Sequence, residues 1–210
     1  STFGGLLMVI LVPDGPYRKT GKKVNLLAFS KVFKNPEFRA SAFGYFGHMW
    51  ELYTFWAFVP VILSTYLEVH SEVEFDISLW SFIIIAIGGL ACVIGGYLSE
   101  VLGAKKTAFG ALSISLVCCL LSPFIFLINN EFIFLSFLMF WGMVVIADSP
   151  LFSTMIAKSA PSEIIGTALT IVNCIGFSIT IISIQLVTGL KEITDSNSIY
   201  IALSIGPIFG

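Results

Sequence analysis

A carboxylic acid and an imidazole lie three residues apart within a long apolar stretch, where Glu51 follows His48. Side chains three residues apart share a face of an α-helix, so the two groups could pass a proton or act together as acid and base. A rise of ~1.5 Å per residue from Ala40 places Glu51 about 16 Å into such a helix, near the middle of a bilayer. A charged group at that depth costs ~2.5–3.5 kcal/mol, so we expect Glu51 to face protein or water.

Two interpretations of Glu51 remain open from the sequence alone. In the functional one, Glu51 takes up and releases a proton that drives transport, with His48 beside it as part of one coupled unit. In the structural one, the carboxyl group is held by a packed hydrogen bond, by His48, or by a residue outside this sequence. The depth of Glu51 favours the functional interpretation, because stability alone rarely offsets the cost of burying a carboxylate.

Four further residues could line a proton or substrate pathway with this pair. Trp141 and Asp148 are seven residues apart and therefore share a helix face. Asn173 lies near the bilayer midplane by the same helix rise, and Tyr45 lies one turn before His48. Each of these also has a structural interpretation, since aromatic and amide side chains often serve packing. Asp148, followed by a serine and a proline, could equally form a helix-breaking element.

Long apolar runs must position these residues. They cover residues 40–67, 77–98, 107–127, 132–157 and 163–188. Each is close to the ~20 residues that a helix needs to cross a bilayer. The composition agrees, because 57% of residues are hydrophobic and 11% are charged, against about 25% charged in soluble proteins. The sequence therefore predicts an all-α, polytopic membrane helix bundle.

The charged turn at residues 95–106 sits between two of these runs and defines their orientation. Loops rich in lysine and arginine stay cytoplasmic, so we place Lys105 and Lys106 inside and alternate the other loops from there. All basic residues except Lys191 then fall on the inner side. The segment 13–39 and the loops near 99–106 and 158–162 are thus expected in the cytoplasm.

The same turn resembles the loop signature of the major facilitator superfamily, in which a glycine, an acid, a second glycine and two basic residues recur at fixed spacing. The matching residues are Gly96, Glu100, Gly103, Lys105 and Lys106. Val101 departs from the pattern, because the family usually has a basic residue there. The loop occurs twice in that family, and the more degenerate copy follows the eighth helix. The resemblance therefore suggests the C-terminal six-helix half of a twelve-helix transporter.

That resemblance implies a division of the chain. Residues 1–12 would end a transmembrane helix of a preceding bundle, 13–39 would form a basic connector, and 40–210 would form the C-terminal bundle. The runs at 1–12 and 199–210 are too short to cross a ~30 Å core, so we expect helices cut at both ends. The connector could be a short helix on the inner leaflet or a solvated basic loop.

The functional expectation is a secondary active transporter in the cell membrane that moves a small solute by alternating access, coupled to protons as a symporter. Its partners would be the lipid bilayer, the solute and the missing N-terminal half, with the protein acting as a monomer. Glu100 would meet a helix N-terminus in that absent half. A sensor or scaffold that keeps the fold, and a membrane-embedded enzyme using His48 and Glu51, are the alternatives.

Several function classes find no support in the sequence. A net charge of −2 leaves no basic surface for nucleic acid. Two histidines, His48 and His70, give no convincing metal-ligand spacing, and no phosphate-binding glycine loop or nucleophile elbow occurs. We expect no cofactor, metal or catalytic residue. The four cysteines lie in apolar runs and are interpreted as packing residues.

Overall fold

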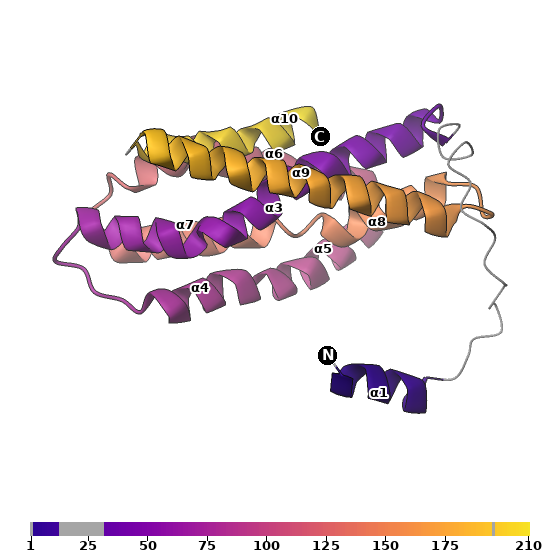
Figure 1. Cartoon of the computed structure of the whole chain (residues 1–210), viewed down its shortest axis with the longest axis horizontal. Coiled ribbons are helices and arrows are strands. Elements are labelled where there is room, and N and C mark those ends of the chain that lie inside the picture. The colour runs from indigo at the N-terminus through magenta and orange to yellow at the C-terminus, as the bar shows by residue number, and fades with distance from the viewer. Residues whose placement is uncertain (1, 13–31, 195) are drawn as a thin grey trace.

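The computed structural model describes residues 2–12, 32–194 and 196–210, and every regular element in those ranges is helical. In chain order the elements are α1 (Thr2–Leu11), α3 (Pro36–Val69), α4 (Ile77–Ala86), α5 (Gly88–Leu102), α6 (Ala104–Ile125), α7 (Glu131–Val144), α8 (Ser149–Ser159), α9 (Ile165–Ile193), the 3₁₀-helix η1 (Asn197–Ser204) and α10 (Ile205–Phe209). Figure 1 shows the elements from α3 onward lying lengthwise beside one another. The predicted all-α bundle is confirmed.

Five stretches are long and apolar enough to cross a membrane, and two of them each comprise two helices. They are Pro36–Val69, Ile77–Leu102, Ala104–Ile125, Glu131–Ser159 and Ile165–Ile193. Each predicted run corresponds to one of these stretches. The shorter segments Thr2–Leu11 and Asn197–Phe209 are apolar helices below that length, as expected for the two terminal runs.

The first spanning helix begins earlier than residue 40, the boundary expected from hydropathy. Asn35 caps α3, because its side chain accepts a hydrogen bond from the backbone N–H of Glu37. Pro36 occupies the first helical turn, where its missing N–H costs nothing, and Glu37 complements the positive end of the helix dipole. The last four residues of the expected connector thus belong to α3. Residues 13–31 of that connector lie outside the described residues.

Two of the predicted continuous runs are interrupted. The span 77–102 breaks at Ile87 between α4 and α5, and the span 131–159 breaks at residues 145–148 between α7 and α8. The second break precedes Pro150, whose ring and missing N–H end the preceding helix. The expected helix-breaking element at Asp148 is therefore present.

A single glycine joins α5 to α6. Gly103 has φ +87° and ψ 142°, the only positive φ among the described residues. This backbone region is nearly exclusive to glycine, so the second glycine of the loop signature makes the sharp turn possible.

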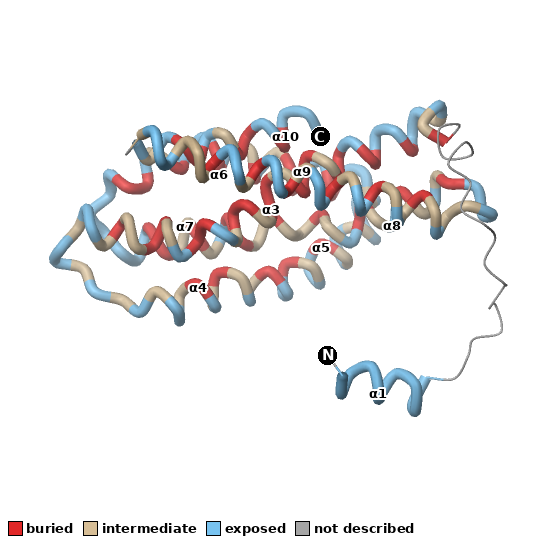
Figure 2. The backbone as a smooth tube through the Cα atoms, viewed as in Figure 1, coloured by how far each residue is buried: buried red, intermediate tan, exposed pale blue. Residues whose placement is uncertain are grey.

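The bundle is organised around α3, which packs against α4, α8, α9 and α10. Figure 2 shows buried residues along α3, α6 and α7, whereas α1 is exposed over its whole length. Two apolar cores meet on α3. One includes Tyr45 and Met49 towards its N-terminus, and the other includes Leu52 and Phe55 towards its C-terminus. His48 and Glu51 lie at the junction, which is where the buried polar contacts occur.

Candidate functional site

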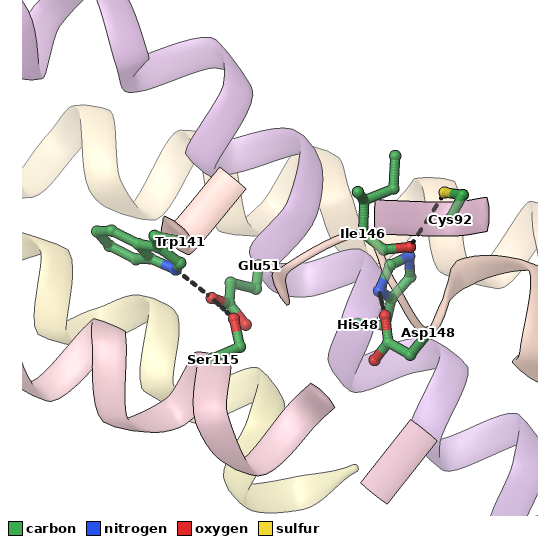
Figure 3. A network of polar contacts seen from close by, with 7 residues as sticks. All are labelled: His48, Glu51, Cys92, Ser115, Trp141, Ile146 and Asp148. Atoms are coloured by element: carbon green, nitrogen blue, oxygen red, sulfur yellow. Dashed lines mark hydrogen bonds and ion pairs between the residues drawn. The ribbon is translucent and has the colours of Figure 1, made fainter. Parts of the chain in front are cut away.

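Three helices surround the carboxyl group of Glu51, which is 1% exposed. Its Oε1 accepts hydrogen bonds from Ser115 Oγ at 2.5 Å, Trp141 Nε1 at 2.7 Å and Cys119 Sγ at 3.2 Å. Figure 3 shows the carboxyl group pointing towards Trp141 and Ser115. All three donors are neutral groups. Among the described residues, no lysine or arginine is buried with them.

Local sequence places each donor. Ser115 and Cys119 are four residues apart and both belong to the buried face of α6, so their side chains follow one another along that face. Trp141 lies in the last turn of α7, and its ring packs 4.6 Å from that of Phe55, measured between ring centroids. The aromatic contact orients the indole so that its N–H reaches Glu51.

His48 contacts a different carboxyl group from the one expected. Its Nδ1 lies 2.8 Å from Oδ1 of Asp148, and both side chains are 1% exposed. Figure 3 shows this pair beside the Glu51 cluster, as a separate set of contacts. The Nε2 atom of His48 is buried and has no hydrogen-bond partner among the described residues. His48 and Glu51, predicted to act side by side, thus belong to two separate clusters of contacts. Each cluster has one member on α3 and its other members on neighbouring elements.

Asp148 is positioned by the break between α7 and α8. Its carbonyl accepts hydrogen bonds from the amides of Leu151 and Phe152 at 3.0 and 3.1 Å, which starts α8. The ring centroid of His48 lies 6.0 Å from that of Phe152 and 6.2 Å from that of Tyr45. Tyr45 is buried and packs beside His48, and its place in a proton or substrate pathway stays a prediction.

Asn173 is not brought to this region. It is exposed on α9, whose buried residues are Ala168, Val172, Gly176, Thr180, Ser183 and Val187. The structure therefore places His48, Glu51, Tyr45, Trp141 and Asp148 together and leaves Asn173 on the outer face of the bundle.

The signature loop lies apart from these clusters. Glu100, Lys105 and Lys106 are exposed, Gly96 is partly exposed, and Gly103 forms the turn. The contact of Glu100 with a helix N-terminus elsewhere in the protein stays a prediction.

A cavity of about 390 Å³ opens between the first turns of α3, the first half of α6 and the C-terminal part of α8. Its lining includes Glu37, Ser41, Lys105, Phe152 and Lys158, but neither Glu51 nor His48. Within the described residues, no group of three or more histidine, cysteine or acidic side chains is placed to hold a metal ion.

Sequence reasoning missed two of the three donors to Glu51. The sequence interprets Cys119 as a packing residue and does not single out Ser115, because an isolated hydroxyl or thiol in an apolar run gives no signal of its partner. Their four-residue spacing was the available signal. A second missed contact joins α3 to α9, where Thr54 Oγ1 donates to Ser183 Oγ at 2.9 Å in a buried setting.

Comparison with known families agrees with the resemblance seen in the signature loop. The family model of the Major Facilitator Superfamily matches residues 1–184. No curated protein and no solved structure gives a significant match.

Proposed function

Since the chain belongs to the major facilitator superfamily of membrane transporters, we propose that it serves proton-driven transport of a small solute by alternating access. In this proposal Glu51 is the group that takes up and releases the proton. The membrane-spanning helices and the family support transport in general. The proton-carrying role rests on the surroundings of Glu51.

The observation that carries the proposal is a fully buried carboxyl group with only neutral hydrogen-bond donors. Burial in an apolar region disfavours the ionised form, whereas three donors on Oε1 favour it. A structural carboxylate at this depth usually gains a cationic partner, because a buried charge is costly without one. Opposed effects of this kind suit a group that must exist in both forms during a transport cycle.

The alternatives receive less support from the geometry. An embedded enzyme using His48 and Glu51 as an acid/base pair needs those groups to act together, but His48 contacts Asp148 instead. A sensor or scaffold would need Glu51 only for packing. Uptake measurements distinguish a scaffold from a transporter.

The test uses the intact protein in lipid vesicles loaded with a pH-sensitive dye. Small solutes are first screened for one that moves protons across the wild-type vesicles. With that solute, we expect Glu51→Gln to retain exchange of labelled for unlabelled solute but to lose accumulation driven by a proton gradient. Glu68→Gln makes the same chemical change at an exposed position and should behave as wild type.

Accumulation at the wild-type level in Glu51→Gln would refute the role of Glu51. The coupling group would then be sought at Asp148 or in a carboxylate elsewhere in the protein. Failure of all solutes to move in any variant, with the protein folded in the vesicles, would instead favour the scaffold interpretation.

A further inference from the structure

We propose that His48 and Asp148 form a lock on a hinge between α7 and α8, and that α8 moves as a unit about residues 145–148 when the lock opens. The lock is the 2.8 Å contact between the two side chains. The role of the lock in alternating access rests on the proposed function. The existence of the hinge does not depend on that function.

Pro150 creates the hinge in the backbone. Its nitrogen carries no hydrogen, so it cannot donate to the carbonyl of Ile146 as position 150 of a continuous helix would. That carbonyl instead accepts from the amide of Ser149 at 3.0 Å, which is a turn-type bond between residues three apart. It also accepts a weak bond from Cys92 Sγ at 3.6 Å, visible in Figure 3. The helical hydrogen-bond ladder is therefore interrupted between α7 and α8.

Glycines of α5 face the hinge and present no side chains to it. A Cβ atom added to Gly95 would lie 2.6 Å from the carbonyl oxygen of Ala147, and one added to Gly88 would lie 2.8 Å from the side chain of Ile146. The backbone at Gly95 thus packs directly against that of Ala147, and the side chain of Ile146 packs against Gly88, as small residues allow in membrane helices. No long side chain from these positions interlocks with the hinge. The break at Ile87 in the facing span lies next to Gly88.

The contact between His48 and Asp148 is specific, unlike the contacts between the hinge and the glycines of α5. Its two members come from different elements, with His48 in the middle of α3 and Asp148 at the start of α8. Apolar contacts such as that of Phe152 over Gly44 can re-form after a small shift. Breaking the contact between His48 and Asp148 costs more, because separation leaves buried polar groups without a partner in an apolar region. The pair therefore favours two discrete positions of α8 relative to α3, with the contact closed or open, over a continuous range of positions.

Amide hydrogen exchange of the intact protein in lipid nanodiscs, read by mass spectrometry, tests the lock without a substrate or a gradient. In the wild type we expect residues 145–149 to exchange faster than α7 and α8 on either side. Asp148→Asn and His48→Gln should each speed exchange in residues 145–159 by about tenfold, since local opening governs exchange. The double variant should match the single variants, because either change removes the same contact.

A matched control is Thr54→Val, which removes another buried polar contact of α3, the one with Ser183. It should leave residues 145–159 at the wild-type rate. Residues 176–187 of α9 contain Ser183 and should respond to Thr54→Val alone, whereas residues 77–86 of α4 report whether each variant keeps the overall fold.

Three results would overturn the lock: wild-type exchange in both single variants, additive effects in the double variant, or an equal effect of Thr54→Val. Uniform protection across residues 131–159 of the wild type would overturn the hinge, and this measurement requires no variant to fold. A negative outcome here leaves the transport result for Glu51→Gln unaffected, so the two proposals fail separately.

Discussion

The charge of Glu51 can be measured through the hydrogen bond that it accepts from Ser115. Ser115→Ala deletes only the hydroxyl group, whose Oγ lies 2.5 Å from Oε1 of the carboxyl group. Trp141 and Cys119 remain as donors, so Oε1 is not left without a partner. The cost of the substitution therefore reflects the strength of one hydrogen bond, which depends on whether its acceptor is neutral or ionised.

The free-energy cost of Ser115→Ala differs measurably between a neutral and an ionised Glu51. A neutral hydrogen bond between membrane helices contributes about 0.6 kcal/mol on average, whereas one to a charged group contributes ~1.5–3 kcal/mol. If Glu51 gains and loses a proton between pH 5 and pH 9, Ser115→Ala should cost about 0.6 kcal/mol at the lower pH and ~1.5–3 kcal/mol at the higher. The sign follows because the ionised carboxylate, present at high pH, is the stronger acceptor.

The assay is equilibrium unfolding in mixed detergent micelles at both pH values, for wild type and for Ser115→Ala. In a Glu51→Gln background the acceptor is always neutral, so the cost of Ser115→Ala should be the same at both pH values. Ser183→Ala removes the bond donated by Thr54 and calibrates the cost of a neutral contact. A cost in the wild-type background that does not change with pH would refute the inference that Glu51 changes its charge.

Two further predictions concern packing and topology. Gly95→Ala should destabilise the fold by ~1–3 kcal/mol in detergent unfolding, since the added Cβ would press on the carbonyl of Ala147. Gly96→Ala, next to it, meets open space and should be neutral or stabilising, so equal losses would show that the close approach does not matter. Single cysteines at Lys106 and Glu72, both exposed, should be labelled from opposite sides of the membrane. Labelling of both from one side would overturn the predicted topology.

Hydropathy was sufficient to predict the spanning segments because each is set by the thickness of the bilayer. It could not predict the break at Ile87, because hydropathy does not register the two glycines, Gly88 and Gly89, that follow it and weaken the helix there. Pro150 did carry a signal of a helix end, and the break before it was foreseen as one interpretation of Asp148. Both breaks therefore lie beside residues that weaken a helix, namely Pro150 in one span and the glycine pair in the other, and a hydropathy average reads neither.

The depth of a residue in the bilayer could be calculated from the helix rise. The direction in which its side chain points could not be obtained in that way. Asn173 illustrates the difference, since it was placed near the midplane yet faces outward on α9. The buried residues of that helix recur mostly every four residues, and Asn173 is one position after Val172 in this series. This periodicity could have shown that Asn173 lies off the buried stripe. The hydrogen-bond partners of Glu51 were harder to predict, because the donors come from helices far away in sequence.

The sequence-predicted pair and the observed pair can both have a place in the proposed mechanism. His48 and Glu51 are three residues apart on α3, so His48 stays near Glu51 whatever α8 does. In the proposed mechanism Glu51 is neutral while it holds a proton, and Asp148 is the carboxyl group in contact with His48. When Glu51 releases the proton in this mechanism, its negative charge would attract the imidazole of His48 away from Asp148, which would weaken the lock. Because coupling of this kind is reciprocal, opening the lock must in turn favour proton release from Glu51. In the proposed mechanism His48 thereby couples the hinge to the proton site.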